Sequence, residues 1–316
     1  MGQTPGLRGT PPSRCHTNRV SFPEHGRPAT GPATDEGVLP TENFLRQVTP
    51  LDIDGLRREF PDRRIDYYPT IDSTMRVAAA LELGEAVLAD EQTAGLGRHG
   101  HSWHSEAGSG IYCSIVLKPA PVLTLALGLA TADAIAKSTG IACDLRWPND
   151  VMIRDRKVAG ILVQLSGTKA IAGIGINVNH ASFPPELAEE ATSLRCHGER
   201  SKPDAPTEPR PEGAVAAAAC ATRLGGDASQ PIPREPIIAA LLRAVDEYTA
   251  YDTAAILRLF TQASSYAAGR RVEVHQPDGV TRGVTAGLNP DGFLVVRRDD
   301  GTDTLIIAGG VRAAGS

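Results

Sequence analysis

The segment of the sequence best equipped for chemistry is a glycine-rich stretch at residues 90–104. It places one arginine, Arg98, among closely spaced glycines, which are Gly95, Gly97 and Gly100. Glycine lets backbone N–H groups approach an anion closely, and a guanidinium pairs well with phosphate or carboxylate. The segment therefore suits an anionic ligand, and we expect it to become ordered when that ligand binds. A flexible surface loop is the competing interpretation of these residues alone.

Three histidines in the same segment raise the hypothesis of a metal site. They are His99, His101 and His104, and imidazole is a common ligand of transition metals. No cysteine or carboxylate cluster lies nearby in the sequence to complete a coordination shell. We therefore expect these side chains to be solvated or to contact a ligand, and we predict no metal ligands among the site residues.

A second stretch combines a Trp-Pro-Asn-Asp turn with a lysine. Arg146, Trp147, Asn149 and Asp150 precede Lys157, which enters the apolar run at residues 158–163. A lysine at this place is either a residue at the edge of a sheet or a deliberately placed cation, and the residues alone favour the edge. A tight hairpin at residues 153–157 would bring Gly160 near Asp150.

A third stretch places glycine and asparagine at alternate positions. Gly173 and Gly175 leave one face of a strand without side chains, and Asn177 and Asn179 follow with amide groups. This arrangement gives a flat ligand both space and hydrogen bonds. A buried strand weakened by glycine is the alternative, and a dinucleotide-binding turn is excluded because no helix opens after the glycines.

The elements that would position these stretches are strands and helices in mixed order. We predict strands at residues 86–90, 111–117, 158–165 and 170–178, and helices at 75–83 (capped by Ser73 and Thr74), 123–138, 237–248 and 254–263. Short strands separated by Asp-Gly turns follow from about residue 267, which is typical of a small β-barrel. The fold class is therefore α+β.

Proline and glycine concentrate in two other places. Residues 1–50 are predicted to be a disordered extension, and about 198–236 a low-complexity insertion with a helix at 214–224; both are expected to be dispensable for chemistry. The predicted domains are thus 1–50, 51–266 and 267–316.

The composition narrows the class of protein. The 316 residues carry a net charge of −5, 41% are hydrophobic and only 4% are aromatic. These values argue against wholesale disorder and against nucleic-acid binding by base stacking. The five cysteines form no CxxC pair, and neither a secretory signal nor an apolar run of membrane-spanning length is visible. We therefore expect a cytoplasmic protein without membrane contact.

Taken together and in this order, the three stretches resemble the biotin protein ligases. The family's glycine-arginine loop stands here as residues 95–103, its Trp-Pro-Asn-Asp block with the following lysine as 146–162, and its Gly-x-Gly-x-Asn strand as 173–179. The resemblance implies a catalytic domain like that of class II aminoacyl-tRNA synthetases, followed by a small SH3-like C-terminal β-barrel.

The resemblance also implies a two-step reaction. Biotin and ATP, with Mg²⁺, would form biotinyl-5′-AMP, which would then acylate one lysine of the biotin carboxyl carrier protein of acetyl-CoA carboxylase. Lys157, Arg98 and Asp150 would be the catalytic residues, which reverses the edge interpretation of Lys157. The implied biotin-binding residues are Ser73, Thr74, Met75, Gln92, Gly95, Leu96, Gly97, Arg98 and Lys157, and the nucleotide-binding residues are Trp103, Asn149, Asn177 and Asn179.

Three departures from the family pattern bear on function. Leu96 and His101 stand where the family often has arginine, and Met75 stands where it commonly has asparagine. Retention of the adenylate is therefore in question. The resemblance leaves a homodimer open, and the proline- and glycine-rich N-terminal region predicts no DNA binding. A lipoate or octanoate ligase of the related fold, and a biotin-binding sensor or repressor without turnover, remain as alternatives.

Overall fold

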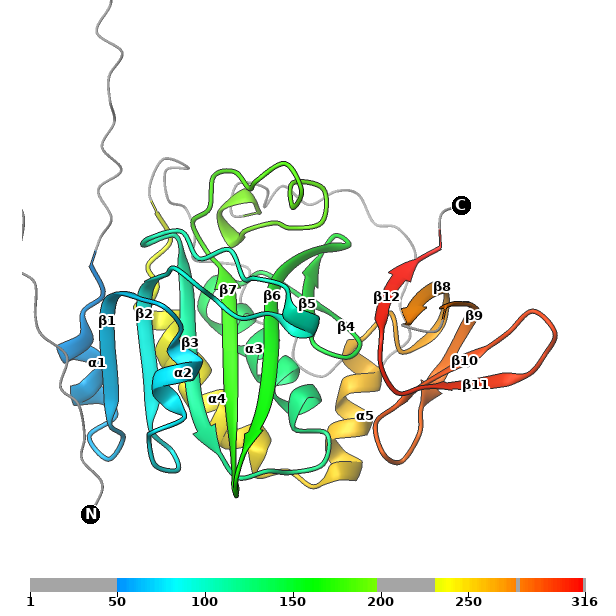
Figure 1. Cartoon of the computed structure of the whole chain (residues 1–316), viewed down its shortest axis with the longest axis horizontal. Helices are drawn as coiled ribbons and strands as arrows, with labels where there is room; N and C mark the ends of the chain where they lie inside the picture. Colours follow the sequence, from blue (N-terminus) through cyan, green and yellow to red (C-terminus); the bar gives the residue numbers. More distant parts are fainter. Residues whose placement is uncertain (1–49, 198–230, 277–278, 315–316) are drawn as a thin grey trace, which may run out of the picture. The chain divides into compact units, whose positions relative to one another are not determined.

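The computed structural model describes residues 50–197, 231–276 and 279–314, which form a mixed α/β structure (Figure 1). The predicted N-terminal extension, except Pro50, and the predicted helix at 214–224 lie outside the described residues. The helices are α1 (Ile53–Glu59), α2 (Thr74–Ala78), α3 (Leu123–Thr139), α4 (Glu235–Thr249) and α5 (Thr253–Ala263).

The first sheet has seven strands and carries the three stretches singled out in the sequence. Its order is β1-β2-β3-β7-β6-β5-β4, with β1 parallel to β2 and the other neighbours antiparallel. The strands are β1 (Ile65–Ile71), β2 (Ala86–Gln92), β3 (Gly110–Leu117), β4 (Asp144–Arg146), β5 (Asp150–Ile153), β6 (Arg156–Ser166) and β7 (Lys169–Asn177).

Helices cover both faces of this sheet. Figure 1 shows α3 and α4 on one face, where they complete the main buried apolar cluster. The short helix α2 lies on the opposite face, where Met75 and Ala78 pack with Val87, Val116 and Ile171 in a separate cluster. Strands β2, β3 and β7 are thus largely buried on both faces, whereas β6 is exposed at its C-terminal end. Burial on both faces is typical of a near-continuous hydrophobic run such as that of β7. None of the described helices is long and apolar enough to cross a membrane.

Most predicted elements are confirmed within one to three residues, but the first helix is shorter than predicted. Helix α2 ends at Ala78, and residues 79–85 form turns before β2. Ser73 holds the N-cap position, yet its side chain makes no capping hydrogen bond. By contrast, α3 ends as predicted at Gly140, whose φ of 73° permits the left-handed cap conformation.

The predicted insertion is structured at its C-terminal end, which corrects its upper boundary. Arg234 is 4% exposed and its guanidinium lies 2.6 Å from the Asp90 carboxylate. The backbone of Ile232 exchanges two hydrogen bonds with the Asn179 side chain. Residues 232–236 therefore belong to the packed domain, because they supply a buried cation and the first turn of α4.

The second sheet is antiparallel and contains the strands predicted between the Asp-Gly turns. Its order is β11-β10-β9-β8-β12, and Gly292 and Gly301 adopt positive φ values at two of the turns. The strands are β8 (Ala268–Gln276), β9 (Gly279–Leu288), β10 (Leu294–Arg297), β11 (Asp303–Ile306) and β12 (Gly310–Ala313).

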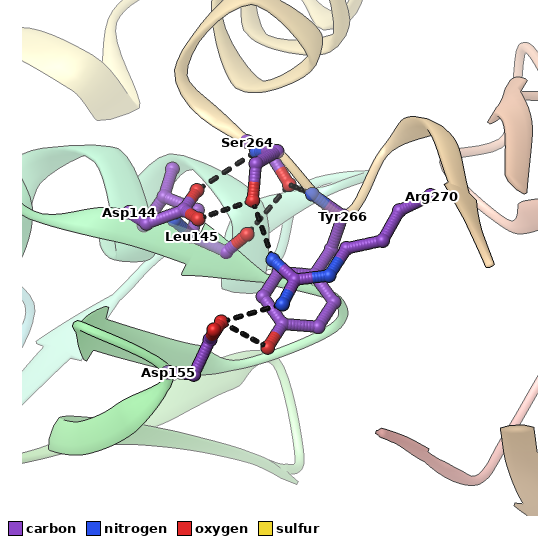
Figure 2. Close-up of polar contacts among 7 residues, drawn as sticks. Asp144, Leu145, Asp155, Ser264, Tyr266 and Arg270 are labelled. Atoms are coloured by element: carbon purple, nitrogen blue, oxygen red, sulfur yellow. Dashed lines mark hydrogen bonds and ion pairs between the residues drawn. The ribbon is translucent and has the colours of Figure 1, made fainter. Parts of the chain in front are cut away.

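A polar network ties residues 264–270, which lead from the end of α5 into β8, to the first sheet (Figure 2). Ser264 donates to the Leu145 carbonyl at 2.5 Å. At the β5–β6 turn, Asp155 accepts hydrogen bonds from the Tyr266 hydroxyl at 2.8 Å and the Arg270 guanidinium at 2.6 Å. The guanidinium also lies 3.9 Å from the centre of the Tyr266 ring. The β5–β6 hairpin is therefore anchored at its tip.

Candidate active site

Two cavities lie beside the glycine-rich segment and bring together most of the predicted site residues. The smaller, of about 50 Å³, is lined by Thr74, Met75, Gln92, Leu96, Gly97, Arg98, Trp103, Asn149 and Lys157 among others. The larger, of about 1250 Å³, adds Gly95, Asp150 and Asn177. Six residues line both cavities, which are Gln92, Gly97, Arg98, Trp103, Asn149 and Lys157. A ligand with one apolar and one anionic end would therefore meet these six residues where its two ends join.

The glycine-rich segment is folded as a small hairpin. Leu96 and Ser102 form an antiparallel bridge, and the Gly97 N–H donates to the His101 carbonyl at 2.8 Å. A Cβ on Gly95 would lie 2.8 Å from the Trp103 carbonyl oxygen, and one on Gly97 would lie 2.9 Å from that of His101. Both glycines are thus required by the close approach of the hairpin's own strands, which the ligand interpretation did not foresee.

The glycines of β6 and β7 make room for Trp103. A Cβ on Gly175 would lie 2.4 Å from the indole, and one on Gly160 would lie 2.8 Å from it. Trp103 thus occupies part of the space expected for a flat ligand, while Gly160, Gly173 and Gly175 also line the smaller cavity. Gly173 similarly accommodates Met75, whose sulfur would lie 2.7 Å from an added Cβ. The hairpin is held against the sheet by its terminal tryptophan.

A carboxylate between two cations forms the charged part of the site. The Lys157 Nζ lies 2.6 Å from Asp150 Oδ1, and Arg146 lies 2.8 Å from Asp150 Oδ2. Asp150 pairs with Gly160 across β5 and β6, as the predicted hairpin requires. Lys157 also lies over the Trp103 ring, 5.3 Å from its centre. It is therefore a positioned cation rather than an edge residue.

The charge of Asp150 is stabilised by these neighbours. Burial by itself would raise the pKa of Asp150, but the attraction of Lys157 and Arg146 outweighs burial and lowers it below the ordinary value. Asp150 thus stays ionised, and its negative charge fixes both cations next to the cavity. The two cations and one anion leave a net positive charge for an incoming anion.

Arg98 is directed into the site by Asn149. Its guanidinium donates to Asn149 Oδ1 at 2.9 Å, while Asn149 Nδ2 donates to the Ile161 carbonyl at 3.0 Å. Burial lowers the pKa of Arg98 somewhat, and the nearby Asp150 opposes this effect. Arg98 remains a cation at neutral pH, since the ordinary pKa of a guanidinium lies far above neutral.

Polar side chains from two elements meet at the smaller cavity. Gln92, at the end of β2, accepts hydrogen bonds from the Thr74 N–H and hydroxyl at 2.9 and 3.0 Å. The Thr74 hydroxyl lies 2.8 Å from that of Ser114, and the Gln92 amide donates to Ser105 at 3.0 Å. This chain fixes polar groups beside the apolar wall that Met75 and Leu96 contribute.

Three predicted residues are placed differently from the rest. Asn177 lines the larger cavity, and its amide donates to the Thr192 carbonyl. Asn179 is engaged with Ile232 and lines neither cavity, and Ser73 is buried and also lines neither. We therefore expect Asn179 and Ser73 to support the site without contacting a ligand.

Sequence reasoning omitted two arginines that line the larger cavity, Arg146 and Arg312. Arg146 was passed over although it begins the Trp-Pro-Asn-Asp block, and its place four residues before Asp150 was a usable signal. Arg312, in β12, lies 2.8 Å from Glu190, and both line the cavity. No local signal identifies that pair, because it depends on how distant segments pack.

Comparisons with known proteins agree with this geometry. Residues 67–180 match the model of the "Biotin/lipoate A/B protein ligase family", and residues 268–311 match that of the "Biotin protein ligase C terminal domain". The first match contains the glycine-rich hairpin, Asp150, Lys157 and the β7 glycines. The second covers all five strands of the C-terminal sheet in whole or in part.

Individual relatives show the same relationship. The bifunctional ligase/repressor BirA of Bacillus subtilis is 38% identical over 158 residues, or 44% of this chain and 49% of that protein. The biotin–[acetyl-CoA-carboxylase] ligase of Mycobacterium tuberculosis is 37% identical over 134 residues, or 39% of this chain and 50% of that protein. The matches thus span about half the length of these relatives.

A solved structure is similar over a longer part of the chain. The biotin protein ligase from Aquifex aeolicus in complex with biotin and ATP is 26% identical, with a TM-score of 0.63, covering 80% of this chain and 99% of that one. Residues 67–180 therefore form a domain of the biotin/lipoate A/B protein ligase family, and residues 268–311 form a C-terminal domain of the biotin protein ligase type.

Proposed function

We propose that this protein activates biotin with ATP and transfers it to one lysine of the biotin carboxyl carrier protein of acetyl-CoA carboxylase. The observation that carries the proposal is the position of Arg98 and Lys157, which line both cavities. A carboxylate held in the smaller cavity and a polyphosphate in the larger one would both face these cations. The relatives' names, and the biotin and ATP bound by the Aquifex aeolicus protein, support this assignment.

In the first step, a biotin carboxylate oxygen attacks the α-phosphorus of ATP. The bond between that phosphorus and the β-bridging oxygen breaks, and pyrophosphate leaves. Two anions must approach each other, so the barrier is lowered by fixed positive charge at the point of contact. Arg98, positioned by Asn149, and Lys157, positioned by Asp150, would supply it, and Arg146 lies where it would face the leaving phosphates.

In the second step, the amine of the acceptor lysine attacks the acyl carbon of biotinyl-5′-AMP, and AMP leaves. The amine must be unprotonated at attack. Asp150 is one of the anions that line the larger cavity, and it lies between Lys157 and Arg146. Asp150 would orient the incoming amine, or it would give up its ion pair with Lys157 as AMP departs. The mixed anhydride is labile, so water must be excluded until the acceptor binds.

The glycine-rich hairpin would cover the adenylate. Trp103 would form one wall for the nucleotide, and the hairpin from Gly95 would close over the junction of the cavities. Leu96 and His101 supply no fixed positive charge at positions where the family often has arginine. His101 is exposed, so it would hold an anion only when protonated. We therefore expect the adenylate to escape more readily than it would from a hairpin with arginines at both positions.

Mg²⁺ would enter with ATP and neutralise phosphate charge. Both oxygens of Asp150 already face cations, so this carboxylate is poorly suited to bind the ion. The phosphates themselves would hold Mg²⁺, and the chain would contribute Arg98, Arg146 and Lys157 around them.

The decisive experiment is ATP-dependent transfer of labelled biotin to the carrier domain. The intact chain should label it, and Lys157→Ala should lose most of the activity. Lys137→Ala is the matched control, since Lys137 lies on α3 and pairs with Asp133 outside both cavities. Absence of transfer by the intact chain would reject the proposal, and full activity of Lys157→Ala would remove that residue from the mechanism.

Ligand titration separates this proposal from the alternatives. Binding of biotin in preference to lipoate excludes a lipoate or octanoate ligase, and release of pyrophosphate with biotin and ATP excludes a sensor without turnover. Salt-sensitive DNA binding would instead support a regulator. Cytoplasmic location, the homodimer and the domain limits at residues 50 and 266 remain part of the proposal.

A further inference from the structure

Two histidines and a glutamate meet beside the larger cavity, and the proposed ligation does not use them. One nitrogen each of His104 and His180 and one oxygen of Glu106 lie within 4.8 Å of one another. His104 comes from the sequence cluster of three histidines, whereas His99 and His101 are exposed and stand apart from this group. The fold thus supplies a carboxylate and a second imidazole that the local sequence did not reveal.

The backbone around these residues is fixed by the sheet. The segment with His104 and Glu106 leads into β3, and the segment with His180 follows β7. These strands are neighbours, with Gly110 opposite Asn177, and the Ser109 carbonyl accepts hydrogen bonds from the Val178 and Asn179 N–H groups. Glu106 and His180 are held further by side chains. The Tyr112 hydroxyl donates to the Glu106 carbonyl at 2.9 Å, and the Ser193 hydroxyl donates to the His180 carbonyl at 2.7 Å. The three side chains therefore project from a preorganised frame.

The donors suit a transition metal better than Mg²⁺ or Ca²⁺. Two imidazole nitrogens and one carboxylate oxygen match the ligand preference of Zn²⁺ and its first-row neighbours, whereas Mg²⁺ and Ca²⁺ prefer oxygen ligands. Around a tetrahedral ion with bonds of about 2.0–2.1 Å, ligand atoms lie about 3.3 Å apart. The ligand atoms now lie within 4.8 Å of one another, so binding would draw them closer, and His104 and Glu106, which are each only partly buried, are the side chains that would move.

The cluster lies at the wall of the larger cavity. His104 and Glu106 line the larger cavity, while His180 is fully buried. Phe183 stacks on the His180 ring, with ring centres 5.2 Å apart, and forms an apolar wall. Three protein ligands with a fourth position facing a cavity is the arrangement of zinc sites that keep an exchangeable ligand.

We propose that His104, Glu106 and His180 bind one divalent transition-metal ion, with Zn²⁺ as the best-fitting ion. The bound ion would join the segment directly after Trp103 to the segment directly after β7. It would thereby restrain the C-terminal end of the glycine-rich hairpin. This inference does not depend on the proposed ligase activity, because the coordinating residues and their frame are independent of biotin and ATP.

The test is metal titration of the full untagged chain after treatment with a chelator. Calorimetry with Zn²⁺ should show one site per chain, and Co²⁺ should give the visible absorption of a low-symmetry site. Loss of a hydrogen-bond partner of a ligand typically weakens metal binding about 10- to 100-fold. We therefore expect His104→Ala, which removes a ligand, and Glu106→Gln, which replaces an anionic ligand by a neutral amide, to weaken Zn²⁺ binding at least about tenfold.

The control is the double variant His99→Ala/His101→Ala, which removes two nearby exposed imidazoles and leaves the cluster intact. Its Zn²⁺ affinity should equal that of the unmodified chain. His180 is fully buried, so its replacement is a poor test. Both single variants have partly exposed side chains, and circular dichroism verifies that they are folded. Unchanged binding in both single variants, loss of binding in the double variant, or no stoichiometric binding by the intact chain would each overturn the proposal.

Discussion

Replacing Gly175 by alanine is the sharpest test of how the hairpin is seated. The new Cβ would lie 2.4 Å from the Trp103 indole, where ordinary contact begins at 3.4 Å. The Trp103 ring must therefore move away from β7 by about 1 Å. The backbone of β7 cannot move instead, because hydrogen bonds hold it to β3 on one side and to β6 on the other. Overpacking of this kind costs about 1–3 kcal/mol.

The expected results are a lower free energy of unfolding in urea and a shift of tryptophan emission towards that of an exposed indole. The chain has two tryptophans, and Trp147 is 3% exposed and bonded to the Gly292 carbonyl, so the shift reports on Trp103. Gly173→Ala is the matched control. Its Cβ would meet the flexible end of Met75 at 2.7 Å, and it should cost less than about 1 kcal/mol because methionine adapts easily.

The reasoning would be refuted if Gly175→Ala unfolded at the same urea concentration as the unmodified chain with unchanged emission. Equal destabilisation by the two variants would also refute it, because the loss of stability is expected from the rigid Trp103 ring and not from any side chain added on β7.

Two other substitutions test the charged groups. Asp150 has a lowered folded-state pKa, so its stabilising contribution is present above its ordinary value of 3.8 and is lost as the pH falls through the folded value. The free energy of unfolding in urea should therefore be lower for Asp150→Asn than for the unmodified chain at pH 7, and this difference should shrink below about pH 4. A difference that stays constant with pH would contradict this. Arg234→Met should lower the free energy of unfolding by about 3–5 kcal/mol, because it leaves the Asp90 charge buried without its 2.6 Å partner. Adding Asp90→Asn to Arg234→Met should recover part of that loss, and no recovery would mean that the ion pair is not the cause.

The sequence predicted the elements whose signals are local. The alternating pattern of β3, the near-continuous apolar runs of β6 and β7 and the amphipathic helices α4 and α5 could be identified because each pattern extends over several residues. Strand β1 was missed because Pro69 interrupts it, which is tolerated at the edge of a sheet. Strands β4 and β5 were missed because they contain only three and four residues.

The site was predictable as a set of motifs but not as a packed arrangement. Arg98 stood out by residue type and spacing, whereas the roles of Asp150 and Lys157 followed only from the family resemblance. The structure places all three at the larger cavity. The burial of Arg234 against Asp90 and the meeting of His104 with His180 join residues far apart in the chain. A segment rich in proline and alanine gives no sign that its last residues enter the core.

The anchored tip of the β5–β6 hairpin sets a condition for exchanging parts between relatives. This hairpin carries Asp150 on one strand and Lys157 on the other, while Asp155 at its turn is held by Tyr266 and Arg270 (Figure 2). A chimera joined after residue 270 would retain both anchors, whereas one joined before residue 264 would replace them with whatever the donor supplies. Residues 264–270 should therefore be kept together with the seven-stranded sheet when parts are exchanged.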